Sequence, residues 1–282
     1  MRVLVFSATY DEAGNIGGVL NGTVDAVPYA DILVVDDAST DGTVAVMRGL
    51  QLPQLTIIER PGKMGLGSAH LLAFCHAMHC GYDVLVSLDA DGSHQPCAIP
   101  LLIEKIREGN DFVIGSRYCA GGRCDYTGYR LHVSQVANRA ARRLLGIALS
   151  EFTTSFRAFR VTALRRLWLP GLRRGGYSFF MAAVVEGARN DFQMVDVPIH
   201  FLRRGYGVSK IAKLEIFRGM ATLLQLAVVR RLPVSKSRRG GGLAPCRSCA
   251  SPYAWIEGMP SGAYARDGGG CVQCGANDGA AV

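Results

Sequence analysis

Short apolar runs alternate with longer mixed segments along the first 116 residues of the chain. The runs are three to five residues long, and each stops at polar or glycine-containing residues, as buried strands of a parallel sheet do. The segments between them are predicted to be helices. Strands are predicted at residues 3–6, 32–35, 55–58, 84–88 and 112–114, and helices at 16–26, from 39–43 to 50, at 69–80 and at 99–107. This alternation predicts an α/β fold with a doubly wound, mostly parallel sheet.

Polar residues and glycines follow every predicted strand. Because ligands of open α/β sheets bind at the carboxyl ends of the strands, we expect these residues to gather along one edge. Acids there can hydrogen-bond a ribose or a base, cations can neutralise a diphosphate, and glycines allow close backbone approach. In chain order the residues are Tyr10, Asp11, Glu12, Asp36, Asp37, Lys63, Gly65, Gly67, Asp89, Asp91 and Arg117.

The most informative of these segments follows the fourth predicted strand. Asp89 and Asp91 end the apolar run that begins at Val84, and Gly92 and Pro96 then indicate a loop. Two carboxylates at this spacing can place oxygen ligands around one hard cation such as Mg²⁺ or Mn²⁺. The alternative interpretation is an ordinary Asp-rich turn.

Composition describes a globular protein whose positive charge is concentrated in one region. Of the 282 residues, 49% are hydrophobic and 19% are charged, and the formal net charge is +8. From Arg117 to Arg174 there are twelve arginines but only Asp125 and Glu151 as acids. Such a block suits a phosphate-bearing substrate, an anionic membrane surface or nucleic acid, and the alternative is a solvated basic face.

The chain begins directly with a predicted strand and shows no signal-peptide pattern, so we expect a cytoplasmic location. Its longest apolar segment, 214–229, contains Glu215 and Arg218 and is shorter than the ~20 residues of a membrane-spanning helix. Basic residues along it would suit a helix lying in the membrane interface, which would make the protein peripheral at the cytoplasmic membrane face. The alternative is a surface helix docked on its own domain.

The C-terminal region has a different composition. Residues 233–245 are basic and glycine-rich and are predicted to be a linker. The two Cys-x-x-Cys pairs beyond it, Cys246 with Cys249 and Cys271 with Cys274, can close a tetrahedral Zn²⁺ site. Residues 246–282 are therefore predicted to be a small zinc-ribbon-like module with an unknown partner, and disulfides are the alternative.

Six motifs occur in an order that resembles family 2 glycosyltransferases, and more narrowly the dolichol-phosphate (polyprenol-monophosphate) mannosyltransferases. They are Thr9–Glu12 (TYDE), Val35–Thr43 (VDDASTDGT), Lys63–Gly67 (KMGLG), Leu88–Asp91 (LDAD), Gly115–Tyr118 (GSRY) and Gly207–Lys210 (GVSK). The resemblance covers residues 1–232 and implies a GT-A type, Rossmann-like catalytic domain. It also implies inverting transfer of a sugar, with mannose from GDP-mannose the first expectation, to a polyprenyl phosphate. The alternatives are glucosyl or N-acetylhexosaminyl transfer from a UDP-sugar, and a non-catalytic nucleotide-sugar-binding protein.

The resemblance also implies roles for individual residues. Asp89, Asp91 and Arg117 would be catalytic, and Asp89 and Asp91 would hold Mg²⁺ or Mn²⁺. Phosphate or acceptor contacts would come from Arg157, Arg203 and Lys210. The donor would be bound by Thr9, Tyr10, Glu12, Asp36, Asp37, Lys63, Gly65 and Ala90.

Three positions depart from the family's pattern. Glu151 stands where the family has Asp, Ser155 where it has Gly, and Ser93 where it often has a Gln metal ligand. The resemblance assigns no role to His94. A single histidine in a loop is more often a hydrogen-bonding or solvated residue than a ligand or a base.

Overall fold

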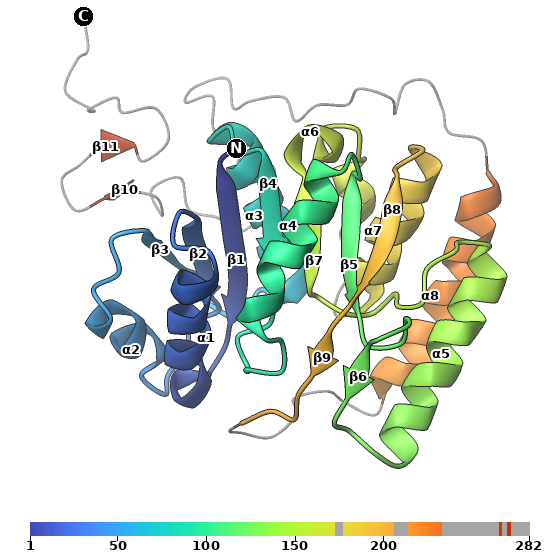
Figure 1. The fold of residues 1–282 in the computed structure, drawn as a ribbon, viewed down its shortest axis with the longest axis horizontal. Coiled ribbons are helices and arrows are strands. Elements are labelled where there is room, and N and C mark those ends of the chain that lie inside the picture. Colours follow the sequence, from blue (N-terminus) through green and yellow to red (C-terminus); the bar gives the residue numbers. More distant parts are fainter. Residues whose placement is uncertain (173–176, 206–213, 233–264, 267–269, 272–282) are drawn as a thin grey trace, which may run out of the picture.

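The computed structural model describes residues 1–172, 177–205, 214–232, 265–266 and 270–271 (Figure 1). Its main body is a seven-stranded sheet in the order β3-β2-β1-β4-β7-β5-β8. The strands are β1 (Val3–Thr9), β2 (Asp31–Asp36), β3 (Leu55–Glu59), β4 (Val84–Ser87), β5 (Phe112–Ser116), β7 (Arg157–Arg160) and β8 (Met194–Pro198). Every pairing in it is parallel except those of β7, which runs antiparallel to both β4 and β5. The predicted α/β fold with a mostly parallel sheet is confirmed.

Helices cover both faces of this sheet. The helices are α1 (Ala13–Ala26), α2 (Thr43–Gly49), α3 (Leu66–His79), α4 (Ile99–Arg107), α5 (Tyr129–Leu145), α6 (Val161–Leu164), α7 (Tyr177–Arg189) and α8 (Leu214–Arg231). Short 3₁₀ turns are η1 (Pro96–Ala98) and η2 (Leu169–Leu172). Small two-stranded pairs are formed by β6 (Arg123–Cys124) with β9 (His200–Phe201) and by β10 (Ala265–Arg266) with β11 (Gly270–Cys271).

The apolar pattern of the strands explains the layers. Successive side chains of a strand point to opposite faces, so each strand buries both sets when helices cover the sheet on both sides. In β1, Val3 and Val5 pack into the cluster formed with α1 and α4, whereas Leu4 and Phe6 pack into the cluster formed with α3 and α7. The strand is therefore apolar at consecutive positions, as the sequence pattern predicted.

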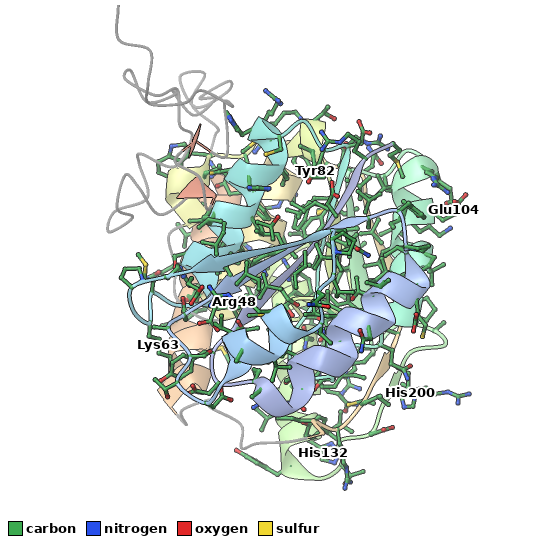
Figure 2. All side chains as sticks on the ribbon, turned by 90° about the vertical axis from the view of Figure 1, so that its left-hand side faces the viewer. Arg48, Lys63, Tyr82, Glu104, His132 and His200 are labelled. Atoms are coloured by element: carbon green, nitrogen blue, oxygen red, sulfur yellow. The ribbon has the colours of Figure 1, made fainter. Side chains whose placement is uncertain are left out.

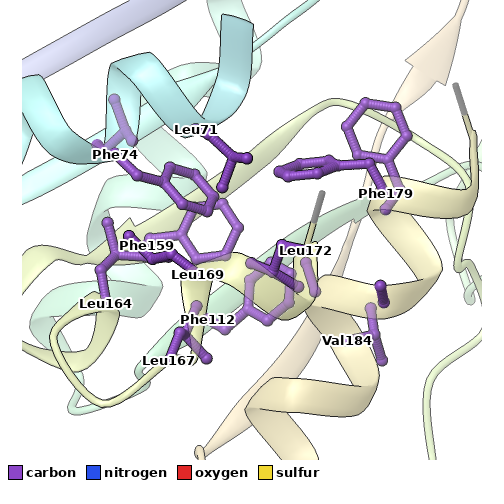
Figure 3. Packing of buried hydrophobic residues seen from close by; sticks show 14 of the residues in the cluster. Leu71, Phe74, Phe112, Phe159, Leu164, Leu167, Leu169, Leu172, Phe179 and Val184 are labelled. Carbon is purple, nitrogen blue, oxygen red and sulfur yellow. The ribbon is translucent and has the colours of Figure 1, made fainter. Parts of the chain in front are cut away.

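Aromatic rings fill much of the second cluster (Figure 3). The rings of Phe112 and Phe159 stack at a centroid distance of 4.2 Å, and Phe74 from α3 meets Phe159 edge-on at 5.0 Å. These contacts attach the antiparallel strand β7 to its neighbour β5 and to the helix above both. They hold in place the segment just before β7, which reaches the candidate site.

The carboxyl ends of the parallel strands meet at one edge of the sheet. The N-terminus lies at the top of Figure 1, where β1 begins, so this edge faces the lower side of the picture. Figure 2 keeps the same vertical direction and shows Lys63 and His200 in its lower half, whereas Tyr82 and Glu104 lie higher. The parallel registers pair Thr9 with Asp36 and Asp36 with Glu59, so the polar residues that follow β1, β2 and β3 lie along this edge, as expected.

Candidate active site

Asp89 and Asp91 lie in the loop that leaves β4. Asp89 accepts a hydrogen bond from the Ser155 hydroxyl at 2.5 Å, and Asp91 accepts one from the Ser93 backbone N–H at 2.9 Å. Burial, with the neighbouring charge of Asp91, raises the pKa of Asp89 to about 7. Burial also works to raise the pKa of Asp91, but the Ser93 N–H and Arg204 outweigh it and lower that pKa. Two close carboxylates with opposite pKa shifts form a site that favours an added positive charge.

Arg204 already contributes one such charge. Its Nε and Nη2 donate to Asp91 Oδ2 at 3.0 and 2.9 Å, and Nη2 lies 3.4 Å from Glu12 Oε1. Arg204 therefore joins the acids after β1 and β4 into one cluster. The predicted contact was its neighbour Arg203, which donates to the backbone carbonyl of Asp125 from an exposed position. In the sequence, only the adjacent arginines 203 and 204 shortly after β9 pointed to a cation here. Their positions in the sequence could not show which of the two side chains points toward the acids.

Arg117 is held at the next strand end by Glu151. The guanidinium donates to Glu151 Oε1 at 2.9 Å from Nε and at 2.5 Å from Nη2, and the Arg117 backbone N–H donates to Oε2 at 3.0 Å. Its Cζ also lies 4.2 Å from the centroid of the Phe201 ring. Burial disfavours the charge of Arg117, but Glu151 outweighs burial and raises the pKa of Arg117. The Glu151 departure from the family pattern thus keeps an acid bound to Arg117.

The ends of β1 and β2 carry the residues predicted to bind a nucleoside. Asp36 is buried and accepts hydrogen bonds from the Thr9 hydroxyl at 2.8 Å and from the Ser39 hydroxyl and N–H. The Nζ of Lys63 lies 3.8 Å from the centroid of the Tyr10 ring. These residues come together as predicted, and the Lys63–Tyr10 contact places a cation and an aromatic face beside Asp36's strand end.

Asp37 supports the glycine loop. Its carboxylate forms an ion pair with the buried Arg60 and accepts a hydrogen bond from the Gly65 N–H at 2.9 Å. Arg60 in turn donates to the Gly65 carbonyl and to the Ser68 hydroxyl, and Gly65 has a φ of +89° that suits glycine. Asp37 was predicted to bind the donor, but in this structure its oxygens position the loop that carries Lys63.

Two of the predicted contact residues have buried side chains. Arg157 is 1% exposed and donates to the backbone carbonyls of Thr154, Phe152 and Phe180, so it cannot hold a substrate phosphate in this structure. Ala90 is also buried, with its methyl group in an apolar cluster with α1, and its predicted donor contact stays a prediction.

Several predicted residues cannot be placed. Lys210 lies outside the described residues, and so do Cys246, Cys249 and Cys274. Of Cys271 the structure describes only the backbone, in β11. The zinc site, the linker and the domain boundary near 232 therefore stay predictions.

The residues that are present fit a divalent cation. Among the described residues no group of three or more His, Cys, Asp or Glu side chains could hold a metal alone. A Mg²⁺-type site needs only one or two carboxylates when substrate phosphates and water complete it, and Asp89 and Asp91 provide two. Ser93, at the position where the family often has Gln, is buried, and its Oγ has no hydrogen-bond partner within the described ranges.

Comparison with known proteins decides the family. The profile described as glycosyl transferase family 2 matches residues 5–168, which include both strand-end acids and the segment carrying Glu151. The chain belongs to this family. It is also 40% identical to the undecaprenyl-phosphate mannosyltransferase of Micrococcus luteus. That alignment spans 215 residues and covers 75% of this chain and 88% of that protein. A polyprenol monophosphomannose synthase of Mycolicibacterium smegmatis is 37% identical over 235 residues, covering 82% and 89% of the two chains.

The fold of this chain is similar to that of a solved glycosyltransferase. Glucosyl-3-phosphoglycerate synthase from Mycobacterium tuberculosis, solved with Mn²⁺, UDP-glucose and phosphoglyceric acid, aligns with a TM-score of 0.62. The alignment covers 83% of this chain and 81% of that one at 19% sequence identity. At this identity the likeness shows the fold alone, which is that of GT-A glycosyltransferases.

Proposed function

We propose that this glycosyltransferase transfers mannose from GDP-mannose to a polyprenyl phosphate, with inversion at the anomeric carbon. The observation that carries the proposal is the Asp89–Asp91 pair, which lies at the carboxyl edge of the sheet beside Arg204. The names of the two mannosyltransferase relatives support the sugar and the acceptor class. The donor base rests on the resemblance of the sequence motifs.

The reaction needs no special base. A lipid monophosphate is largely ionised at neutral pH, by analogy with other phosphate monoesters, whose second pKa is about 6. The site must then position that oxyanion for in-line attack and stabilise the departing nucleoside diphosphate. Asp89 and Asp91 would hold a divalent cation, which supplies charge neutralisation on the diphosphate. Arg117, fixed by Glu151, and Arg204 supply cationic side chains on the same edge.

The acceptor lipid requires the protein to work at a membrane surface, and α8 offers a suitable face. Met220, Leu224 and Val228 of α8, with Leu232 just beyond its end, recur every four positions and are 44%, 55%, 59% and 54% exposed. The adjacent side of the helix, with Leu223, Leu226 and Ala227, is buried in the core. We propose that this apolar stripe, residues 220, 224, 228 and 232, lies in the bilayer interface.

The surroundings of the stripe favour an anionic bilayer. Helix α5 lies beside α8 in Figure 1 and contacts it. It contains no acidic residue and has exposed Arg139, Arg142 and Arg143, with Val136 60% exposed between them and the start of the helix. Exposed basic residues on a helix that contacts α8 suit negatively charged lipid headgroups. No helix in the part of the chain that the structure describes is long and apolar enough to cross a membrane.

A sugar-transfer assay tests the proposal. Purified protein, Mg²⁺ or Mn²⁺ and a short polyprenyl phosphate are offered radiolabelled GDP-mannose, UDP-glucose or UDP-N-acetylglucosamine in separate reactions. We expect metal-dependent transfer of label to the organic phase from GDP-mannose. Transfer from a UDP-sugar alone would replace the donor, and no transfer from any donor with nucleotide still bound would favour a non-catalytic binding protein.

A further inference from the structure

His94 is a buried histidine enclosed by the candidate site. Its side chain is 1% exposed, and its ring lies between Phe156 and Phe201 at centroid distances of 5.1 and 5.2 Å. The backbone N–H of Asp89 lies 3.1 Å from Nδ1, and the Thr154 hydroxyl lies 3.3 Å from Nε2. Both ring nitrogens therefore have partners on segments that carry the site.

These contacts fix the state of the ring. A backbone N–H can only donate, so Nδ1 must be the acceptor, and the proton of a neutral imidazole then lies on Nε2. Nδ1 also lies 3.6 Å from Asp89 Oδ2, but without a proton it forms no ion pair with that oxygen.

His94 connects three segments that are distant in sequence. It belongs to the loop that carries Asp89 and Asp91, and it contacts Thr154, whose neighbour Ser155 donates to Asp89. Its backbone pairs with Phe201 in a β-bridge, and the Leu202 N–H donates to the Ser93 carbonyl at 2.9 Å. The chain that continues from there brings Arg204 to Asp91.

We propose that His94 is a positioning residue that holds the Asp89–Asp91 loop in its metal-binding geometry, through the hydrogen bond from the Asp89 N–H to Nδ1. It touches no reacting atom in this role. The inference rests on the proposed function for the identity of the bound cation. In this role, Nδ1 of His94 acts as a hydrogen-bond acceptor. The alternative is that the ring only fills the space between Phe156 and Phe201.

Two variants of nearly equal shape separate these roles. In His94→Asn, Oδ1 can take the place of Nδ1 and accept from the Asp89 N–H. In His94→Leu, a methyl group stands there, and the N–H loses its partner. Both variants remove the ring from between Phe156 and Phe201, so any difference between them reports the acceptor atom.

The measurement is the dissociation constant of Mn²⁺ for the full-length protein in the presence of GDP, followed by electron paramagnetic resonance of free Mn²⁺. We expect His94→Asn to stay within about threefold of the wild type and His94→Leu to bind at least about tenfold more weakly. Without an acceptor at this place, the loop of the free protein moves to pair the Asp89 N–H with water, and Mn²⁺ binding must then reverse that movement. The kcat of transfer should follow the same order. Equal Mn²⁺ affinity of the Asn and Leu variants would overturn the inference.

A substitute variant is available in case His94→Leu does not fold. If His94→Leu gives no folded protein, His94→Gln replaces it, because its longer amide reaches toward Thr154 and leaves the Asp89 N–H without an acceptor. Weak Mn²⁺ binding by this variant supports the inference, and affinity equal to that of His94→Asn overturns it. Since Mn²⁺ binding is measured without a sugar, a wild type that binds Mn²⁺ and transfers nothing would remove the proposed function but not the role of His94.

Discussion

Arg157 shows how the same residue type serves structure or substrate according to burial. The guanidinium donates to three backbone carbonyls, from Thr154, Phe180 and Phe152, and lies over the rings of Phe112 and Phe180. Burial lowers its pKa, because an enclosed cation is disfavoured. The sequence around Arg157 suggested a phosphate ligand. The structure shows instead that Arg157 links the segment before β7 to helix α7 through hydrogen bonds to backbone carbonyls.

Replacing Arg157 should therefore damage stability and spare nucleotide binding. Arg157→Met removes three buried hydrogen bonds to backbone carbonyls, so we expect a loss of about 3 kcal/mol in the free energy of unfolding. Urea unfolding measures this loss. The control Arg48→Met removes an exposed ion pair with Glu59 and should cost less than about 1 kcal/mol. Unchanged stability with lost GDP affinity in Arg157→Met would restore the phosphate role.

At the scale of elements, the loop from β5 to β6 depends on close backbone packing. A Cβ on Gly122 would lie 2.6 Å from the Ser116 carbonyl oxygen and 2.7 Å from the carbonyl carbon of Arg117. Backbone atoms cannot turn away as a flexible side chain can. Any larger residue at 122 must therefore move the segment that presents Arg117.

Gly122→Ala tests this packing. We expect a cost of about 1–3 kcal/mol from overpacking and a lower kcat of transfer, because the Arg117 N–H moves relative to Glu151. Circular dichroism melting and the transfer assay measure the two effects. Gly49→Ala is the control, since nothing lies within 4 Å of its added Cβ. Normal kcat in a folded Gly122→Ala protein would show that the loop does not need this contact.

The apolar stripe of α8 leads to a prediction of its own. Leu224→Glu combined with Val228→Glu should abolish flotation with vesicles that contain anionic phospholipid, because both side chains are more than half exposed and would enter the interface. Val46→Glu on α2 is the control, since Val46 is also an exposed apolar residue but lies on another helix. Equal flotation of the stripe variant and the wild type would exclude this face as the membrane contact.

Element by element, the sequence predicted the parallel half of the sheet best. The strand at 32–35 became β2 with one more residue at each end, and the helix at 99–107 was predicted with its observed bounds. Strand β7 was missed because its four residues, Arg157–Arg160, begin and end with arginine and lack an apolar run. In the site, the strand-end acids were predictable from position. Arg204 and the Asp37–Arg60 pair were not, since their partners lie far away in sequence.

At the scale of the whole molecule, the family match and the described core leave the C-terminal residues 246–282 as a separate question. The two Cys-x-x-Cys pairs there predict a bound Zn²⁺. We expect about one equivalent of zinc by atomic emission in reduced, full-length protein, and none when residues 233–282 are deleted. Zinc well below one equivalent in the full-length protein would exclude the zinc-ribbon interpretation.

The proposed transfer requires the two acids at the carboxyl edge, Asp89 and Asp91, to act with a divalent cation. The most direct measurement compares mannose transfer from GDP-mannose to a polyprenyl phosphate by the wild type, Asp91→Asn and the exposed-acid control Asp25→Asn, at saturating Mg²⁺ or Mn²⁺. We expect the control to match the wild type and Asp91→Asn to lose more than about a hundredfold in kcat, because the substitution removes a charged oxygen that the cation needs. Near-normal turnover by Asp91→Asn would exclude Asp91 as a ligand of a catalytic cation.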